Sequence, residues 1–246
     1  MKIHASKSHP RYLSNYYRDL LVWGVHKGLT SPQGLIAQGR GETFDYLIGE
    51  KTCLFAKKAT MAALAVLIDA KHPVISVNGN AAVLVPKDLV KLSQMLKIPL
   101  EINLFHKSKQ RERKIADYLR KNKATNILLA DNAGIPNLSS NRRFISKHGQ
   151  TIADVVFVPL EDGDRTEHLI SMGKKVIAVD LNPLSRTAQK ATITIVDNIV
   201  RTLPLMIKLY VRLKNTKKEK LEKIIREYNN QTILKEAISH INKYLK

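Results

Sequence analysis

The sequence of 246 residues has a single cysteine and no long apolar run. Because Cys53 stands alone, an internal disulfide and a cysteine-rich zinc site are both excluded, and its plainest interpretation is a buried small hydrophobic side chain. No stretch approaches the apolar length that crosses a bilayer, and the basic N-terminus is not followed by an apolar block. We therefore expect a soluble, cytoplasmic protein that does not interact with membranes.

Two common nucleotide-binding signatures are also missing. The chain contains neither the G-x-x-x-x-G-K-[ST] phosphate loop nor a G-x-G-x-x-G fingerprint after a strand. Its eight histidines form no H-E-x-x-H pattern, which argues against a metal hydrolase. Any nucleotide site must therefore be of another type.

Acidic residues are scarce, with 21 Asp and Glu against 41 Lys and Arg and a net charge of +20. Such a field attracts anions, and nucleic acid is the obvious rival to a small phosphorylated ligand. The excess is concentrated in residues 107–123 and 214–246, where apolar residues recur at helical spacing. Both stretches are most simply the solvated faces of amphipathic helices. We therefore expect ATP as the first anion and no nucleic acid as a partner.

Short β-branched runs alternate with helical patterns, which is typical of a mostly parallel sheet with helices on both faces. We predict a Rossmann-like, doubly wound α/β fold that forms one compact domain. Residues 1–72 are expected to be a helical segment packed on the sheet, broken near Gly28 and again around Gly39 and Gly41. The core spans residues 73–213. A basic helical extension, 214–246, carries no motif, so we expect it to be dispensable for chemistry, with docking on a second subunit as one interpretation. The predicted strands are 74–77, 100–104, 126–130, 155–158, 176–180 and 192–196, and the clearest predicted helices are 86–96 and 197–213.

Ligands of open α/β sheets bind at the carboxyl ends of the strands, so polar loops after strands are the first candidates for a site. The loops 78–80, 131–134, 160–165 and 180–187 are the densest in polar residues. The loop 180–187 offers carboxylate, amide, hydroxyl and guanidinium groups, which suits a nucleotide. The alternative is a capped turn in which Ser185 begins a helix, and both interpretations can hold together.

Three further features have a functional and a plainer interpretation. The carboxylates Glu161, Asp162 and Asp164 could coordinate Mg²⁺ or could only precede a helix. Arg40 lies between two glycines, where it could bind phosphate oxygens or remain solvated in a helix break. The residues 142–143, Arg142 and Arg143, could hold a second phosphate or lie on a solvated surface.

Five ordered motifs taken together resemble archaeal phosphopantothenate synthetase, the family also called 4-phosphopantoate:beta-alanine ligase. The similarity extends from about residue 8 to about residue 213. The motifs are SHPRY at 8–12, TSPQGLIA at 30–37, GRGE with FDYL at 39–47, VPLEDGDRTE at 158–167 and DLNPLSRTA at 180–188.

The resemblance implies ATP-dependent condensation of 4-phosphopantoate with beta-alanine in coenzyme A biosynthesis. The implied products are 4'-phosphopantothenate, AMP and pyrophosphate, formed through a phosphopantoyl-adenylate by a homodimer that uses ATP and Mg²⁺. Two other functions stay open, which are nucleic-acid binding and sugar-phosphate binding without ligase activity. The ATP contacts implied by the motifs are Arg18, Arg40, Asp180, Leu181, Asn182, Arg186, Thr187, Asn198 and Ile199, of which Arg40 and Arg186 are expected to be catalytic. The residues expected to bind substrate are Asn78, Asn80, Arg142 and Arg143.

Overall fold

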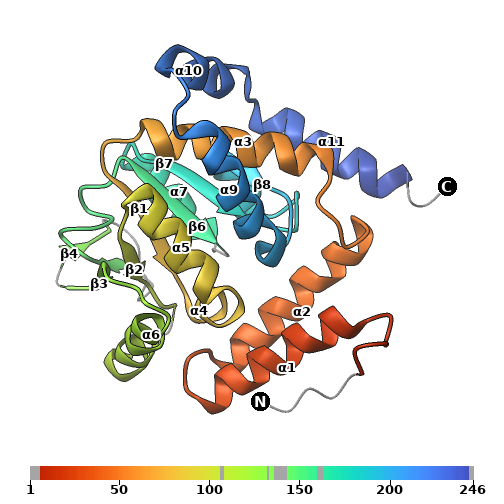
Figure 1. The fold of residues 1–246 in the computed structure, drawn as a ribbon, viewed down its shortest axis with the longest axis vertical. Coiled ribbons are helices and arrows are strands. Elements are labelled where there is room, and N and C mark those ends of the chain that lie inside the picture. The colour runs from red at the N-terminus through yellow and green to blue at the C-terminus, as the bar shows by residue number, and fades with distance from the viewer. Residues whose placement is uncertain (1–5, 106–107, 132, 136–142, 160–162, 244–246) are drawn as a thin grey trace.

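The structure is a computed structural model that describes residues 6–105, 108–131, 133–135, 143–159 and 163–243. Its centre is a six-stranded sheet in the order β3-β2-β1-β6-β7-β8, with every neighbouring pair parallel (Figure 1). This order is that of a doubly wound Rossmann-type sheet, so the predicted fold class is confirmed. The strands are β1 (Pro73–Val77), β2 (Leu100–Ile102), β3 (Ile127–Leu129), β6 (Val155–Pro159), β7 (Lys175–Val179) and β8 (Ile193–Ile195).

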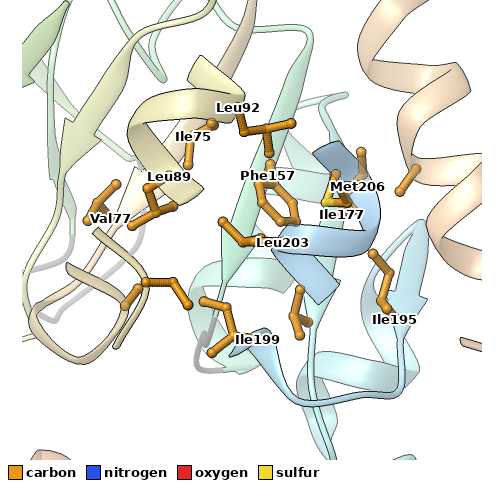
Figure 2. Close-up of a cluster of buried hydrophobic side chains, with 14 of the residues drawn as sticks. Ile75, Val77, Leu89, Leu92, Phe157, Ile177, Ile195, Ile199, Leu203 and Met206 are labelled. Carbon is orange, nitrogen blue, oxygen red and sulfur yellow. The ribbon is translucent and has the colours of Figure 1, made fainter. Parts of the chain in front are cut away.

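All six predicted strands are present, and most of their residues are buried in the sheet, whereas those of the edge strand β3 are half-buried. Alternate residues of one strand face opposite cores. Ile75 and Phe157 belong to the larger core, whereas Val74 and Val156 belong to the smaller one. Figure 2 shows the larger core, where side chains of the sheet meet two helices, α5 (Pro86–Leu96) and α9 (Ile199–Leu213). The smaller core lies against α7 (Gly163–Ser171), through the fully buried Leu169.

Several other helices complete the layers around the sheet. The basic stretch predicted as an amphipathic helix forms α6 (Lys109–Lys121), with Ile115 and Leu119 fully buried. A short antiparallel pair of strands, β4 (Ala133–Gly134) and β5 (Phe144–Ile145), was not predicted because strands so short show no alternation. The remaining helices between the strands are α4 (Gly79–Leu84) and α8 (Arg186–Lys190).

The N-terminal segment consists of α1 (Tyr12–His26), α2 (Pro32–Leu47) and α3 (Leu54–Asp69). The predicted break at Gly28 is confirmed, and this glycine has a φ of 68°. The predicted break around Gly39 and Gly41 is wrong, because α2 runs through both glycines. A glycine inside a helix costs only about 1 kcal/mol relative to alanine, which the rest of the helix can offset. The only cysteine, Cys53, is buried at the start of α3 as expected.

The basic C-terminal residues form α10 (Lys218–Glu227) and α11 (Asn230–Lys243), which lie along α3 of the same chain (Figure 1). Their apolar sides are buried there, including Leu221, Ile233 and Leu234. Within the described residues, no helix combines the length and the apolar character needed to cross a bilayer.

Candidate functional site

A cavity of about 710 Å³ lies at the carboxyl ends of the strands, near the point where the strand order reverses between β1 and β6. Its walls come from α2, from the loops after β1 and β7, and from the first residues of α8 and α9. Ten of the predicted site residues are brought together around this space, although their distance in sequence is large. They are Arg40, Asn78, Asn80, Asp180, Leu181, Asn182, Arg186, Thr187, Asn198 and Ile199.

The loop after β7 is organised by its own side chains. The buried carboxylate of Asp180 accepts hydrogen bonds from the backbone N–H of Asn182, at 3.0 Å, and from the hydroxyl of Ser185. The Ser185 oxygen in turn accepts from the backbone N–H of Ala188, at 2.9 Å, and so caps α8. The capped-turn interpretation of this loop is therefore confirmed, while its contact with a nucleotide stays a prediction.

The surroundings of Asp180 shift the pKa of its carboxyl group. Burial raises the pKa of its carboxyl group, and the hydrogen bonds from Ser185 and Asn182 and the charge of Arg40 only partly oppose that effect. Arg40 contributes to the same cavity from α2. A carboxylate and a guanidinium therefore line the same space, which is large enough for a nucleotide.

Arg186, the first residue of α8, is held by two carboxylates of α7. Its guanidinium forms ion pairs with Asp164 and Glu167, and Glu167 also pairs with Lys190 at 2.9 Å. Gly163 makes this contact possible, because a Cβ atom at this position would lie 2.6 Å from the Cβ of Arg186. The arginine therefore lies at the edge of the cavity with its guanidinium fork already oriented by acidic partners.

The two asparagines predicted to bind substrate serve local structure in this chain. The side-chain oxygen of Asn78 accepts from the backbone N–H of Ala81, at 2.9 Å, and caps α4. The Asn80 amide donates to the carbonyl of Gly34, at 2.8 Å, and accepts a hydrogen bond from the Thr30 hydroxyl. Both asparagines still line the cavity, and their contact with substrate stays a prediction.

The structure does not bring every predicted residue to this cavity. Arg18 lies in a separate hollow between α1 and α2, where its Nε donates to Glu42 Oε2 at 2.9 Å. Arg143 is exposed on the short hairpin, with its guanidinium carbon 4.7 Å from the centre of the Phe144 ring. Three predicted residues, Glu161, Asp162 and Arg142, lie outside the described residues.

A buried polar network was missed by the sequence analysis. Glu101, on β2, is fully buried and accepts hydrogen bonds from the backbone N–H groups of Ser146, at 3.0 Å, and Gln150, at 2.6 Å. Arg165, on α7, is also buried and donates to the hydroxyl of Ser76 at 3.0 Å. Burial raises the pKa of Glu101 despite these bonds. A carboxylate inside an apolar strand was the available signal, since such a group requires partners.

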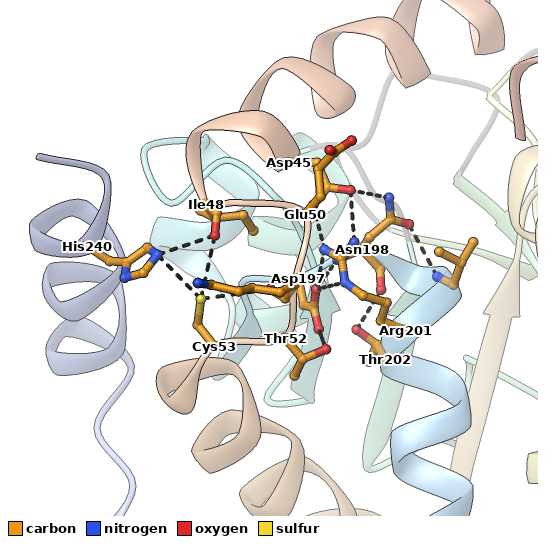
Figure 3. Close-up of polar contacts among 12 residues, drawn as sticks. Asp45, Ile48, Glu50, Thr52, Cys53, Asp197, Asn198, Arg201, Thr202 and His240 are labelled. Carbon is orange, nitrogen blue, oxygen red and sulfur yellow. Dashed lines mark hydrogen bonds and ion pairs between the residues drawn. The ribbon is translucent and has the colours of Figure 1, made fainter. Parts of the chain in front are cut away.

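A second missed cluster joins α2 to the start of α9. Asp45, Asp197 and Arg201 form ion pairs there, and Asn198 donates to Asp45 at 2.8 Å (Figure 3). The sequence offers no local signal for this cluster, because Asp45 and Arg201 are 156 positions apart.

Mg²⁺ has no evident set of protein ligands in the described part of the chain. Asp180 lines the cavity, but its carboxylate already accepts hydrogen bonds from Ser185 and Asn182. Asp164 and Glu167 are both paired with Arg186. No group of three or more His, Cys, Asp or Glu side chains among the described residues could hold a metal ion. The described side chains therefore do not fit a metal ion held by the protein alone.

The chain is similar over nearly its whole length to proteins with assigned names. A family profile described as Phosphopantothenate/pantothenate synthetase matches residues 55–244. A protein of Thermococcus kodakarensis is 52% identical over 97% of this chain and 92% of its own length. Relatives from Methanosarcina mazei and Methanospirillum hungatei are 50% and 41% identical, each over 97% of this chain and over 94% and 97% of their own lengths. All three relatives carry the name 4-phosphopantoate--beta-alanine ligase.

Proposed function

Because this chain belongs to the phosphopantothenate/pantothenate synthetase family, we propose that it is the ligase that joins 4-phosphopantoate to beta-alanine with ATP. The products are 4'-phosphopantothenate, AMP and pyrophosphate, on the route to coenzyme A. The observation that carries the proposal is the similarity to ligases of this name over at least 97% of the chain, in three relatives. The cavity supports it, because eight of the nine residues expected to contact ATP line one space, the exception being Arg18.

The chemistry explains why the site needs cations rather than a nucleophilic side chain. A carboxylate oxygen of 4-phosphopantoate attacks the α-phosphorus of ATP, and pyrophosphate leaves with the electrons of the broken P–O bond. The beta-alanine amine then attacks the acyl carbon, loses a proton and displaces AMP. Both steps depend on orientation and on stabilising negative charge that develops on phosphate oxygens.

The cavity residues divide between the two ends of the nucleotide. We propose that Asp180 accepts hydrogen bonds from ribose hydroxyls and that Arg40 and Arg186 bind the phosphates. All three residues line the cavity, which supports this assignment. Mg²⁺ is proposed to enter on the triphosphate, since the described side chains do not form a site for it. The ATP contact of Arg18 and the substrate contacts of Arg142 and Arg143 stay predictions.

We further propose a cytoplasmic homodimer with no nucleic-acid partner. Exposed apolar side chains on α1 and α2 support a dimer, among them Leu13, Ile36 and Tyr46. Light scattering on the purified protein would measure the oligomeric state. Binding to nucleic acid, the rival function, would weaken steeply with salt as counterions are released, whereas ligation in a cavity would change less.

Product analysis tests the proposed function directly. The purified protein with ATP, Mg²⁺, 4-phosphopantoate and beta-alanine should release AMP and pyrophosphate in equal amounts, measured by chromatography. Formation of ADP and orthophosphate would reject the adenylate route. As a control, the rate of ligation should fall to a small fraction when unphosphorylated pantoate replaces 4-phosphopantoate, because protein groups arranged to bind a phosphate would then have no partner.

The pKa of Asp180 gives the proposal a pH dependence. Because burial raises this pKa, the carboxylate loses its charge at a higher pH than an ordinary aspartate does. As the pH falls through the raised pKa, kcat/KM for ATP should decrease, since kcat/KM reports ionisations of the free enzyme. Asp180→Asn should remove this acid limb. It should also lower kcat/KM at neutral pH by about 10- to 150-fold, equivalent to about 1.5 to 3 kcal/mol, the usual value of a hydrogen bond to a charged group. If the acid limb of the kcat/KM profile is unchanged in Asp180→Asn, the ionisation that causes it belongs to another residue.

A further inference from the structure

Helix α2 forms one wall of the nucleotide cavity, yet it buries little apolar surface. All its residues are described, and the one that is buried is the charged Asp45. Arg40, Gly41 and Phe44 line the cavity and belong to the last two turns of the helix before Asp45. The position of this wall therefore depends on polar contacts more than on packing.

The C-terminal end of α2 is attached to α9 through Asp45. The carboxylate of Asp45 accepts hydrogen bonds from two nitrogens of Arg201 and, at 2.8 Å, from the side-chain amide of Asn198 (Figure 3). Arg201 binds Asp197 at the same time, with its Nε 2.8 Å from Asp197 Oδ1. The other oxygen of Asp197 accepts from the Thr52 hydroxyl at 2.6 Å.

The N-terminal end of α2 is attached to the loop after β1. The Asn80 amide donates to the carbonyl of Gly34, and the Thr30 hydroxyl donates to Asn80. Between the two ends, a Cβ atom at Gly41 would lie 3.5 Å from Leu181, in ordinary contact with the loop after β7. Helix α2 therefore bridges the cavity between two polar anchors.

We propose that Asp45 and Arg201 are positioning residues, which hold α2 against the start of α9 and thereby keep Arg40 at the phosphates of bound ATP. This inference rests on the proposed function. The contact joins two walls of one cavity, since Asn198 and Ile199 at the start of α9 line the same cavity as α2. Neither Asp45 nor Arg201 lines the cavity itself, so their effect on ATP is indirect. It passes through α2, which carries Arg40, and through Asn198, whose side-chain amide Asp45 holds.

The variant Asp45→Asn tests the inference with little risk to folding, because Arg201 keeps its second carboxylate, Asp197. If α2 is docked in a smaller fraction of molecules, the apparent dissociation constant for ATP rises by the inverse of that fraction. We expect an increase on the order of tenfold in this constant by calorimetry, with a parallel increase in KM for ATP. Because saturating ATP restores the docked helix, kcat should stay within about twofold. Arg201→Lys keeps the charge but loses the planar fork, so its dissociation constant for ATP should lie between those of the unsubstituted protein and Asp45→Asn.

Tyr210→Phe is the matched control. It removes a hydrogen bond of 2.7 Å from the same helix, α9, to the carbonyl of Met95, at a site without contact to α2. This variant should lower the melting temperature while leaving ATP binding unchanged. Hydrogen exchange without ATP should be faster across residues 34–45 in Asp45→Asn, slow again at saturating ATP, and normal in Tyr210→Phe.

Two results would overturn the inference, and they differ from each other. If Asp45→Asn lowers the melting temperature but leaves the ATP dissociation constant and the exchange of residues 34–45 unchanged, the ion pair only stabilises the fold. If the unsubstituted protein does not bind ATP at all in calorimetry, the proposed function fails first and this inference fails with it.

Discussion

Arg186→Lys is expected to lower kcat for ligation by about 30- to 1,000-fold, equivalent to about 2 to 4 kcal/mol, the usual cost of removing one preorganised donor. The planar guanidinium can hold two phosphate oxygens at once, whereas lysine presents a single point charge. Arg186 already forms such a forked contact with Asp164 and Glu167. If ATP phosphates take the place of these carboxylates, the contact strengthens as charge moves onto the leaving pyrophosphate. The effect should therefore appear in kcat more than in KM.

Lys190→Met supplies the matched control for this prediction. Lys190 lies on the same short helix and pairs with the same carboxylate, Glu167, at 2.9 Å. It does not line the cavity, and an exposed pair of this kind contributes less than about 1 kcal/mol to stability. Steady-state kinetics should show normal kcat for Lys190→Met. Near-normal kcat for Arg186→Lys would mean that Arg186 only bridges α7 and α8.

The sheet could be predicted from sequence because strands buried on both faces leave a pattern that needs no partner to be recognised. Most of the six runs, such as 155–158, are continuously apolar and bounded by polar loops. The site followed from the same pattern, since the loops after parallel strands gather at one edge. Asp180 and Arg186 were found in this way before any contact was visible.

What could not be predicted depends on partners far apart in sequence. No local property of Asp45 distinguishes it from a solvated helix residue, and only its contact with Arg201 does. Arg165 was assigned to a polar loop, yet in α7 its side chain points into the interior toward Ser76. The continuity of α2 through Gly39 and Gly41 could not be predicted either, because the local preference of about 1 kcal/mol for each glycine is offset by the rest of the helix.

The C-terminal stretch is helical and amphipathic as predicted, but the sequence did not show which surface its apolar side covers. The lysine side chains of α10 are solvated, as expected, but Leu221 and Leu234 are buried at 4% and 1% exposure. The tail also covers β8, which is the edge strand of the sheet. The backbone N–H of Thr194 donates to the side-chain oxygen of Asn230 at 2.8 Å, and the Asn230 amide donates to the carbonyl of Ala188 in α8 at 2.9 Å.

Removal of residues 214–246 is therefore expected to prevent stable folding, although no described residue beyond Ile199 lines the cavity at the carboxyl ends of the strands. The truncation uncovers the apolar side of α3 and the edge of β8, and exposed strand edges promote aggregation. A milder variant measures how much one apolar contact of the tail contributes to stability. Leu234→Ala should lower the free energy of unfolding by about 2 to 5 kcal/mol. That is a large part of the roughly 5 to 15 kcal/mol that stabilises most domains. Circular dichroism with urea denaturation measures both changes.

Charge neutralisation separates the two properties of this tail. Replacing Lys218, Lys220 and Lys223 of α10 by glutamine keeps the apolar face and removes three exposed charges. The free energy of unfolding should then change by no more than about 0.5 kcal/mol for each substitution. A soluble truncation with an unchanged urea midpoint would show that α3 and β8 need no cover from the tail. If instead the lysine variants unfold as readily as Leu234→Ala, the charges rather than the apolar face would hold α10 in place.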